Sequence, residues 1–191
     1  EMALPVAQPL LREVVARNRV RDGIVYVQIT RGVARRDHPF PPGVRPALVI
    51  TARNQTMTHP GARAGVAAIT LPDIRWQRCD IKSVSLLANV LAKQQARESG
   101  AYEAWQVDRD GFVTEGSSTN AWAVTASGEI VTRDASNAIL NGITRLAVIR
   151  LAENAQLKVV ERPFTVEEAK AASEAFLTST GSHVLPTVSI D

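Results

Sequence analysis

The sequence contains a single cysteine, Cys79, among its 191 residues. One thiol cannot form a disulfide within the chain and cannot build a zinc site that needs several cysteines, so we predict no metal site. Cysteine usage of this kind fits a reducing compartment such as the cytoplasm. The sequence also has no apolar run of the roughly 20 residues that a membrane-spanning helix needs, and no basic region ahead of an apolar one near its start. We therefore expect neither a membrane span nor a secretory signal.

Neither sign of charge is in large excess, because the net charge is only +3. The basic residues are scattered, and aromatic residues, at 5% of the chain, are not interleaved with them. This pattern does not favour a nucleic-acid interface. The hydrophobic content of 45% is enough for one large core or at most two small ones, so we expect a soluble globular protein.

Apolar periodicity and β-branched runs together predict an α+β (mixed α/β) protein. Helices are predicted over residues 8–19, 84–99, 146–154 and 166–173. Strands are predicted over residues 24–30, 45–51, 66–70, 102–107, 112–114, 121–124, 158–162 and 175–178. The polar, turn-rich segment 54–65 is predicted to be a loop.

Lys82 lies at the start of the strongest predicted helix, which presents Val84, Leu87, Val90 and Leu91 on one face. Arg75 and Arg78 precede it in the sequence. Burial and neighbouring cations favour the neutral amine of a lysine, and a neutral amine can attack a carbonyl. Taken alone, however, a lysine at a helix start is more often a solvated surface charge.

Three further segments have the chemistry of an anion or cofactor site. Glu115 is followed by Gly116 and three hydroxyl residues, and a second hydroxyl cluster covers residues 179–182. Hydroxyl groups can donate to a phosphate, and a carboxylate can pair with a protonated heterocyclic nitrogen, although a plain serine-rich turn is the alternative. Residues 142–144 precede a predicted helix, where free backbone N–H groups attract phosphate.

The loop over residues 31–42 combines arginines, a histidine and prolines. Irregular segments that are fixed by proline often carry function, and cationic groups there could bind an anion. A solvated turn is the equally open alternative.

The four motifs 78–83, 115–120, 140–145 and 178–180 resemble, in content and in order, those of the fold-type IV pyridoxal-phosphate enzymes. This family includes D-amino-acid transaminases, branched-chain aminotransferases and aminodeoxychorismate lyases. The resemblance implies a large cofactor-binding domain over residues 74–191. Residues 1–73 would then be the remainder of a small N-terminal domain with the interdomain segment.

By position, the resemblance implies that Lys82 forms a Schiff base with pyridoxal 5'-phosphate and shuttles the substrate Cα proton. Glu115 is similar to the carboxylate that keeps the pyridine nitrogen protonated, and Leu140 resembles the residue that packs on the ring. The remaining implied cofactor-binding residues are Ile143, Thr144 and Thr180, which contact the phosphate, and Ser117 and Ser118, which line the pocket.

Tyr26, Arg36 and His38 fall in the pattern Tyr-x-x-x-x-Arg-Gly-x-x-x-Arg-x-His. They resemble the substrate carboxylate trap of D-amino-acid transaminases, to which the neighbouring subunit contributes the arginine and histidine, so a homodimer is implied. The implied reaction is transamination between D-amino acids, such as D-alanine or D-glutamate, and 2-oxo acids. The alternatives are a branched-chain L-amino-acid aminotransferase, an (R)-selective amine transaminase, or an inactive fragment that keeps only the fold.

The resemblance is partial at both ends. Family members carry a further N-terminal segment that supplies an arginine to the cofactor phosphate, and they continue beyond the position of Asp191. We therefore expect the chain to be an internal piece of a longer polypeptide.

Overall fold

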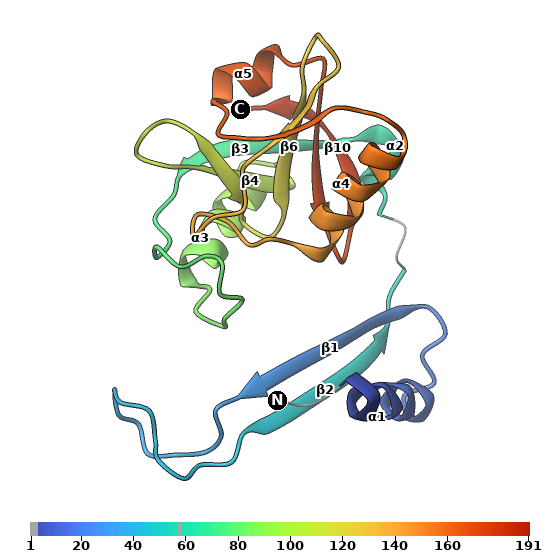
Figure 1. Ribbon diagram of the computed structural model, residues 1–191, viewed down its shortest axis with the longest axis vertical. Helices are drawn as coiled ribbons and strands as arrows, with labels where there is room; N and C mark the ends of the chain where they lie inside the picture. Colours follow the sequence, from blue (N-terminus) through green and yellow to red (C-terminus); the bar gives the residue numbers. More distant parts are fainter. Residues whose placement is uncertain (1–3, 57–58) are drawn as a thin grey trace. The chain divides into compact units, whose positions relative to one another are not determined.

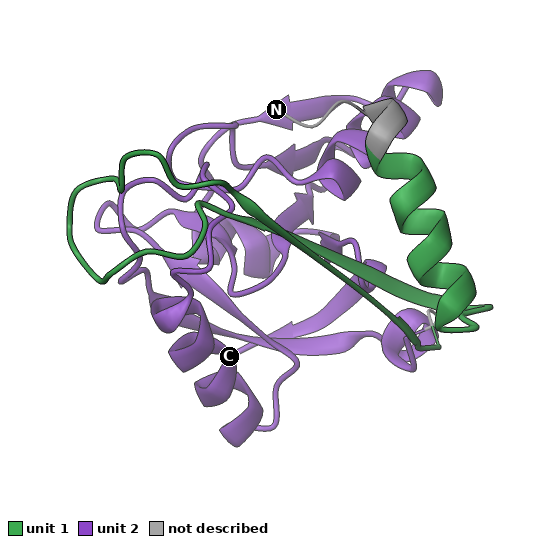
Figure 2. Cartoon of the chain, turned by 90° about the horizontal axis from the view of Figure 1, so that it is seen from below, with its two compact units in different colours: residues 1–57 green, residues 58–191 purple. Residues whose placement is uncertain are grey.

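A computed structural model describes residues 4–56 and 59–191 (Figure 1). The chain divides into two compact units, residues 1–57 and residues 58–191 (Figure 2). Both units combine helices with strands, which confirms the predicted α+β class. Strand β3 (Val66–Pro72) pairs within the sheet of the second unit, and the domain boundary predicted after residue 73 stays a prediction.

The first unit is a two-stranded antiparallel sheet with one helix. Strand β1 (Gly23–Thr30) pairs with β2 (Ala47–Asn54) in a continuous register from Gly23 opposite Asn54 to Thr30 opposite Ala47. Helix α1 (Leu4–Arg17) packs against β2. All three elements were predicted, with ends that differ by a few residues.

The second unit is built on an eight-stranded mixed sheet in the order β5-β4-β3-β10-β9-β6-β7-β8. The pairs β3 with β4, β3 with β10, and β7 with β8 are parallel, and the other neighbours are antiparallel. Its remaining strands are β4 (Glu103–Val107), β5 (Val113–Gly116), β6 (Asn120–Val124), β7 (Ile130–Thr132), β8 (Val159–Glu161), β9 (Glu174–Ser179) and β10 (His183–Ile190).

Four helices accompany this sheet: α2 (Gly61–Ala64), α3 (Leu87–Glu98), α4 (Ile143–Asn154) and α5 (Val166–Ala171). The short helix α2 lies inside the segment predicted to be only a loop. Helix α5 begins as predicted, because the Thr165 hydroxyl accepts the Glu168 N–H at 3.1 Å. Within the part of the chain that the structure describes, no helix is long and apolar enough to cross a bilayer.

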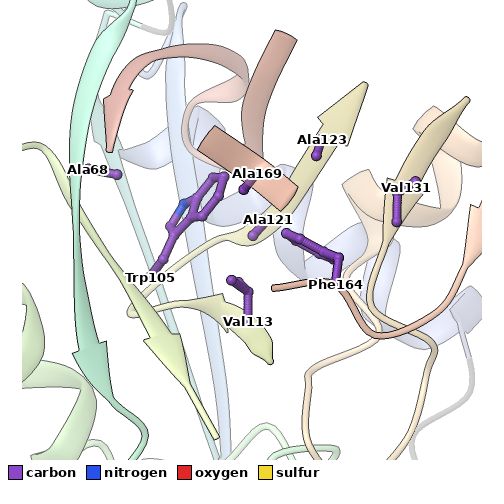
Figure 3. Packing of buried hydrophobic residues seen from close by; sticks show 8 residues of the cluster. All are labelled: Ala68, Trp105, Val113, Ala121, Ala123, Val131, Phe164 and Ala169. Atoms are coloured by element: carbon purple, nitrogen blue, oxygen red, sulfur yellow. The ribbon is translucent and has the colours of Figure 1, made fainter. Parts of the chain in front are cut away.

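The main core cluster joins β3, β4, β5, β6 and β7 to α5 (Figure 3). Trp105 of β4 and Phe164 are fully buried and meet edge to face, with ring centroids 6.4 Å apart. Truncating a buried aromatic residue of this kind costs about 3–5 kcal/mol. The packing therefore fixes the sheet from which the β5–β6 segment extends.

Helix α3 packs on β4 through small residues, with Ala92 and Ala96 buried against Ala104. The predicted apolar face is instead exposed, with Leu87 at 74% and Val90 at 58%. Small side chains let the helix backbone approach the sheet closely, which turns the larger side chains outward. The helix also begins at Leu87 and not at Val84, so the expectation that it begins beside Lys82 is wrong.

Candidate active site

The candidate site is built around the short connection between β5 and β6. Strand β5 ends at Gly116, β6 begins at Asn120, and the Gly116 N–H donates to the Thr119 carbonyl at 2.7 Å. Asn120 lies opposite Thr178 in the antiparallel β6–β9 pair. The beginning of β6 and the end of β9 therefore meet at the same edge of the sheet.

Glu115 lies buried at this edge, with its side chain 8% exposed. Its carboxylate accepts from Arg75 Nη1, from Asn120 Nδ2 at 3.0 Å and from the Leu140 N–H at 3.1 Å. Burial raises the pKa of Glu115 to about 7, although Arg75 acts in the opposite direction. A carboxyl group in this environment can hold or release a proton near neutral pH.

Arg75 is the partner that the sequence analysis missed. Its side chain, only 4% exposed, donates to Asp73 at 2.7 Å and to the Ala138 carbonyl at 3.0 Å as well as to Glu115. Burial opposes its charge, but Asp73 and Glu115 outweigh that effect and raise the pKa of Arg75. The expectation that Arg75 adds free positive charge near Lys82 is therefore wrong, because two carboxylates compensate it.

Asn120 connects Glu115 to the start of α4. Its Nδ2 group donates both to Glu115 and to the Leu140 carbonyl, the latter at 2.8 Å. A Cβ added to Gly142 would lie 2.5 Å from Asn120 Oδ1, so only glycine leaves room for this approach. The network therefore holds Glu115, Leu140 and the N-terminal end of α4 together.

The first turn of α4 offers backbone donors at this point. Gly142 is the N-cap in an extended conformation and has no side chain to cap the turn, while Ile143 is 71% exposed. The first N–H groups of a helix have no partner within the helix, and they attract anions. The Arg145 side chain anchors this turn by donating to the Asn141 side chain at 2.9 Å and to the Arg133 carbonyl at 2.8 Å. Ile143 and Thr144 thus lie in the first turn of a helix, and their contacts with a phosphate stay a prediction.

Thr180 follows the end of β9 and is exposed in the turn before β10. The turn is closed by a hydrogen bond of 2.7 Å between the Ser179 and Ser182 hydroxyl groups. Helix α4 packs against β9, and Asn120 lies opposite Thr178. The predicted phosphate residue Thr180 therefore lies two residues beyond the site's edge of the sheet.

Ser117 and Ser118 belong to the hydroxyl cluster that could donate to a phosphate, but in the structure their hydroxyl groups have another partner. Their hydroxyl groups donate to the buried carboxylate of Glu103, as does the hydroxyl of Thr119 at 3.1 Å. These hydrogen bonds fix the β5–β6 connection that carries Glu115 at one end.

Lys82 lies in the long loop between β3 and α3, and its side chain is exposed. The loop is tied to the segment before Leu140, because the Cys79 N–H donates to the Asn137 carbonyl at 2.9 Å. Arg78, the second cation expected near Lys82, is paired with Asp80 at 2.9 Å. Lys82 is thus neither buried nor flanked by uncompensated cations, contrary to the expectation. The role of Lys82 stays a prediction.

Tyr26, Arg36 and His38 all belong to the first unit. Tyr26 is half exposed on β1, where its hydroxyl donates to Gln28 at 2.6 Å. Arg36 and His38 are exposed on the loop between β1 and β2. The proposed carboxylate trap therefore stays a prediction.

Known proteins are similar to this chain over most of its length. The family described as amino-transferase class IV matches residues 4–190. The D-alanine aminotransferase of Staphylococcus aureus (strain MSSA476) is 44% identical over 183 residues, covering 95% of this chain and 64% of that protein. The D-alanine aminotransferase of Bacillus licheniformis is 45% identical over 181 residues, covering 95% and 63%. The chain thus spans a little under two thirds of the length of these curated relatives.

Solved structures share the fold. A branched-chain amino acid aminotransferase from T.th., solved with pyridoxamine 5'-phosphate, superposes with a TM-score of 0.88 at 28% identity, covering 100% of this chain and 64% of that one. The fold IV-transaminase CpuTA1 from Curtobacterium pusillum gives a TM-score of 0.81 at 21% identity, covering 97% and 65%. The predicted fold type IV is therefore confirmed. Because the family match extends over nearly all of the sequence, the chain belongs to the class IV aminotransferases.

Proposed function

We propose that this chain is part of a pyridoxal 5'-phosphate-dependent aminotransferase that transfers amino groups between D-amino acids, such as D-alanine or D-glutamate, and 2-oxo acids. The observation that carries the proposal is the hydrogen-bonded link from Glu115 through Asn120 to the start of α4. It places a buried carboxyl group and a set of free backbone donors in one site.

These two features fit the two ends of the cofactor. The Glu115 carboxyl group suits the pyridine nitrogen, and the Ile143 and Thr144 N–H groups, with Thr180, suit the phosphate. When bound, pyridoxal phosphate supplies an electron sink for negative charge that develops at the substrate Cα. The chain's own residues then have to hold the cofactor and move the protons.

In this proposal Glu115 holds a proton at the pyridine nitrogen, and Arg75 and Asn120 hold Glu115 in place. Leu140 packs on the ring, and Ser117 and Ser118 fix the adjacent loop. Lys82 would hold the cofactor through its amine and, once that amine is free again, would move the proton between the substrate Cα and the cofactor C4′. Its exposed position on a loop leaves the amine accessible to both reactants.

The D-amino-acid preference is supported by the trio Tyr26, Arg36 and His38. An arginine binds a carboxylate through two parallel hydrogen bonds, and tyrosine and histidine can complete the site. Holding the carboxylate on one side determines which enantiomer presents its Cα–H to Lys82, and so determines handedness. The D-alanine aminotransferases of Staphylococcus aureus and Bacillus licheniformis are 44% and 45% identical to this chain, whereas the branched-chain enzyme from T.th. is 28% identical.

A homodimer in the cytoplasm is the proposed setting. The family resemblance implies that Arg36 and His38 act in the site of the partner subunit. The outward face of α3 offers apolar area for an interface, since Leu87 is 74% and Leu91 53% exposed. The single cysteine supports a reducing compartment.

The test is a substrate comparison with the complete protein that contains this chain, loaded with pyridoxal phosphate. D-alanine, L-leucine and (R)-1-phenylethylamine are each assayed as amino donor to the same 2-oxo acid. The proposal expects D-alanine to give the highest kcat/KM. A clear preference for L-leucine would instead establish the branched-chain activity, and a preference for the amine would establish the third alternative.

A further inference from the structure

Glu103 is a fully buried carboxylate to which the proposed mechanism gives no role. It is the first residue of β4, and it lies below the β5–β6 connection that carries Glu115. Desolvating a carboxylate is costly unless it is paired and hydrogen-bonded, so the contacts of this group indicate what it holds.

Most of these contacts come from the connecting loop, and the N–H of Ala104, the next residue of β4, donates to Oε1 at 2.9 Å. Glu103 Oε1 accepts from Ser117 Oγ, and Oε2 accepts from Ser118 Oγ at 2.9 Å and Thr119 Oγ1 at 3.1 Å. The Ser118 N–H adds a longer contact of 3.3 Å. The ammonium group of Lys93 approaches Oε1 to 3.4 Å from the more exposed side. One carboxylate thus gathers three consecutive hydroxyl groups.

The backbone of the loop is shaped around this carboxylate. A Cβ added to Gly116 would lie 3.0 Å from Glu103 Cγ and would also collide with the Thr119 hydroxyl. The Ser117 carbonyl is held from α3 by Asn89 Nδ2 at 2.9 Å. The loop therefore closes directly over Glu103 and has little freedom to move away from it.

The two residues that flank the loop are both members of the site. Glu115 precedes it and Asn120 follows it, and they are joined by a hydrogen bond of 3.0 Å. A change in the curvature of the loop would change the separation of these two side chains, and with it the position of the Glu115 carboxyl group. We propose that Glu103 is a positioning residue that, through the hydroxyl groups of Ser117, Ser118 and Thr119, sets the placement of Glu115.

The effect of Glu103 on cofactor binding rests on the proposed function, whereas its effect on the placement of Glu115 does not. The same contacts argue that these three hydroxyl groups do not serve the cofactor phosphate. Their protons are committed to a carboxylate, and a phosphate beside Glu103 would meet a like charge.

The test uses Glu103→Gln, which keeps the shape of the side chain but replaces one acceptor oxygen with a donor. The primary readout is the titration midpoint of Glu115 in the cofactor-free complete protein, followed by carboxyl 13C NMR and assigned with Glu115→Gln. Arg75, which donates to Glu115, and Asp73, which pairs with Arg75, are both unchanged in this variant. We expect the midpoint to fall by at least about half a pH unit, because burial raises the pKa of Glu115 and the variant loses that fixed, desolvated position.

The second readout is the dissociation constant of pyridoxal phosphate, which is expected to rise about tenfold, as for loss of hydrogen bonds to a charged group. The matched control is Glu98→Gln, which removes an exposed carboxylate at the end of α3 and should change neither readout. If Glu103→Gln matches this control in the Glu115 midpoint, the proposal is wrong.

Ser118→Ala decides the outcome if Glu103→Gln fails to fold. It removes one donor to Glu103 without burying an unpaired charge, and it should move the Glu115 midpoint in the same direction by a smaller amount. An unchanged midpoint in a folded Ser118→Ala protein would overturn the proposal. If the wild-type protein binds no pyridoxal phosphate, the proposed function fails, but the Glu115 titration still tests Glu103.

Discussion

Arg75 and Glu115 form an ion pair inside the second unit, with their side chains 4% and 8% exposed. The two residues lie 40 positions apart in the sequence, so the pair depends on the folded sheet. Asp73 is a second carboxylate partner of Arg75, and Asn120 is a second donor to Glu115. The pair is therefore the centre of a buried polar network that fixes the carboxyl group proposed to meet the cofactor.

Replacing Arg75 with Gln should destabilise the protein strongly. The change leaves Asp73 and Glu115 buried without their cation, and breaking a buried pair in this way costs about 3–5 kcal/mol. Urea unfolding of the complete cofactor-free protein measures the effect. Arg78→Gln is the matched control, because Arg78 forms an exposed pair with Asp80 and should leave the unfolding midpoint unchanged. Equal losses in the two variants would contradict the structural importance of the network.

The raised pKa of Glu115, about 7 against an ordinary value of 4.5, predicts a pH dependence of stability. Between these values the folded protein retains a proton that the unfolded chain has released, so unfolding releases a proton. The free energy of unfolding should therefore fall as pH rises from 4.5 to 7, by at most about 3 kcal/mol. Burial acts to raise the pKa of Asp73, but Arg75 outweighs burial and lowers this pKa. Asp73 therefore contributes to the pH dependence only at more acidic pH.

Glu115→Gln should remove this contribution. We expect the difference in unfolding free energy between wild type and variant to change steadily across this pH range and to level off outside it. Measuring both proteins at each pH cancels the other titrating groups. A difference that is independent of pH would show that Glu115 titrates at its ordinary value in the folded protein.

Gly142→Ala should weaken cofactor binding without abolishing folding. The φ angle of −63° is accessible to alanine, so the backbone is not strained, but the new Cβ would lie 2.5 Å from Asn120 Oδ1. Either Asn120 or the first turn of α4 has to move. We expect the dissociation constant of pyridoxal phosphate to rise about tenfold, which corresponds to about 1.4 kcal/mol. Gly181→Ala, where the added Cβ meets nothing within 4 Å, is the control for thermal stability.

Arg36→Lys tests the carboxylate trap. A lysine keeps the positive charge but loses the paired hydrogen bonds of the guanidinium group. We expect KM for D-alanine to rise about tenfold or more, with a smaller change in kcat. The same substitution at Arg35, an exposed neighbour, should have no such effect. If both variants behave alike, Arg36 has no specific contact with the substrate.

Local patterns predicted much of the fold, because most elements carry their own periodicity. Two strands were missed for physical reasons. Strand β7 has only three residues, and β10 contains Pro186, which argues against a central strand. The proline is tolerated because pairing of β10 with β3 begins only at Thr187.

The site was predicted in part. Motif order assigned Glu115, Leu140 and the start of α4 to one site, and the Asn120 network joins them in the structure, while their roles toward the cofactor stay predictions. Arg75 and Glu103 were missed, because each looks like a solvated charge until the tertiary structure buries it. The face of α3 that meets the sheet was also predicted wrongly, because the periodicity of a helix does not say which of its two faces packs against the sheet.

The central claim is that Lys82 carries the cofactor, and borohydride reduction of the complete protein with pyridoxal phosphate tests it most directly. We predict an absorbance band in the near-violet that borohydride abolishes, and a pyridoxyl group that mass spectrometry then locates on the peptide containing Lys82. Lys82→Ala should show neither the band nor the label, with the exposed Lys158→Ala as a lysine control. A label on another lysine, or a reducible band that persists in Lys82→Ala, would contradict the account.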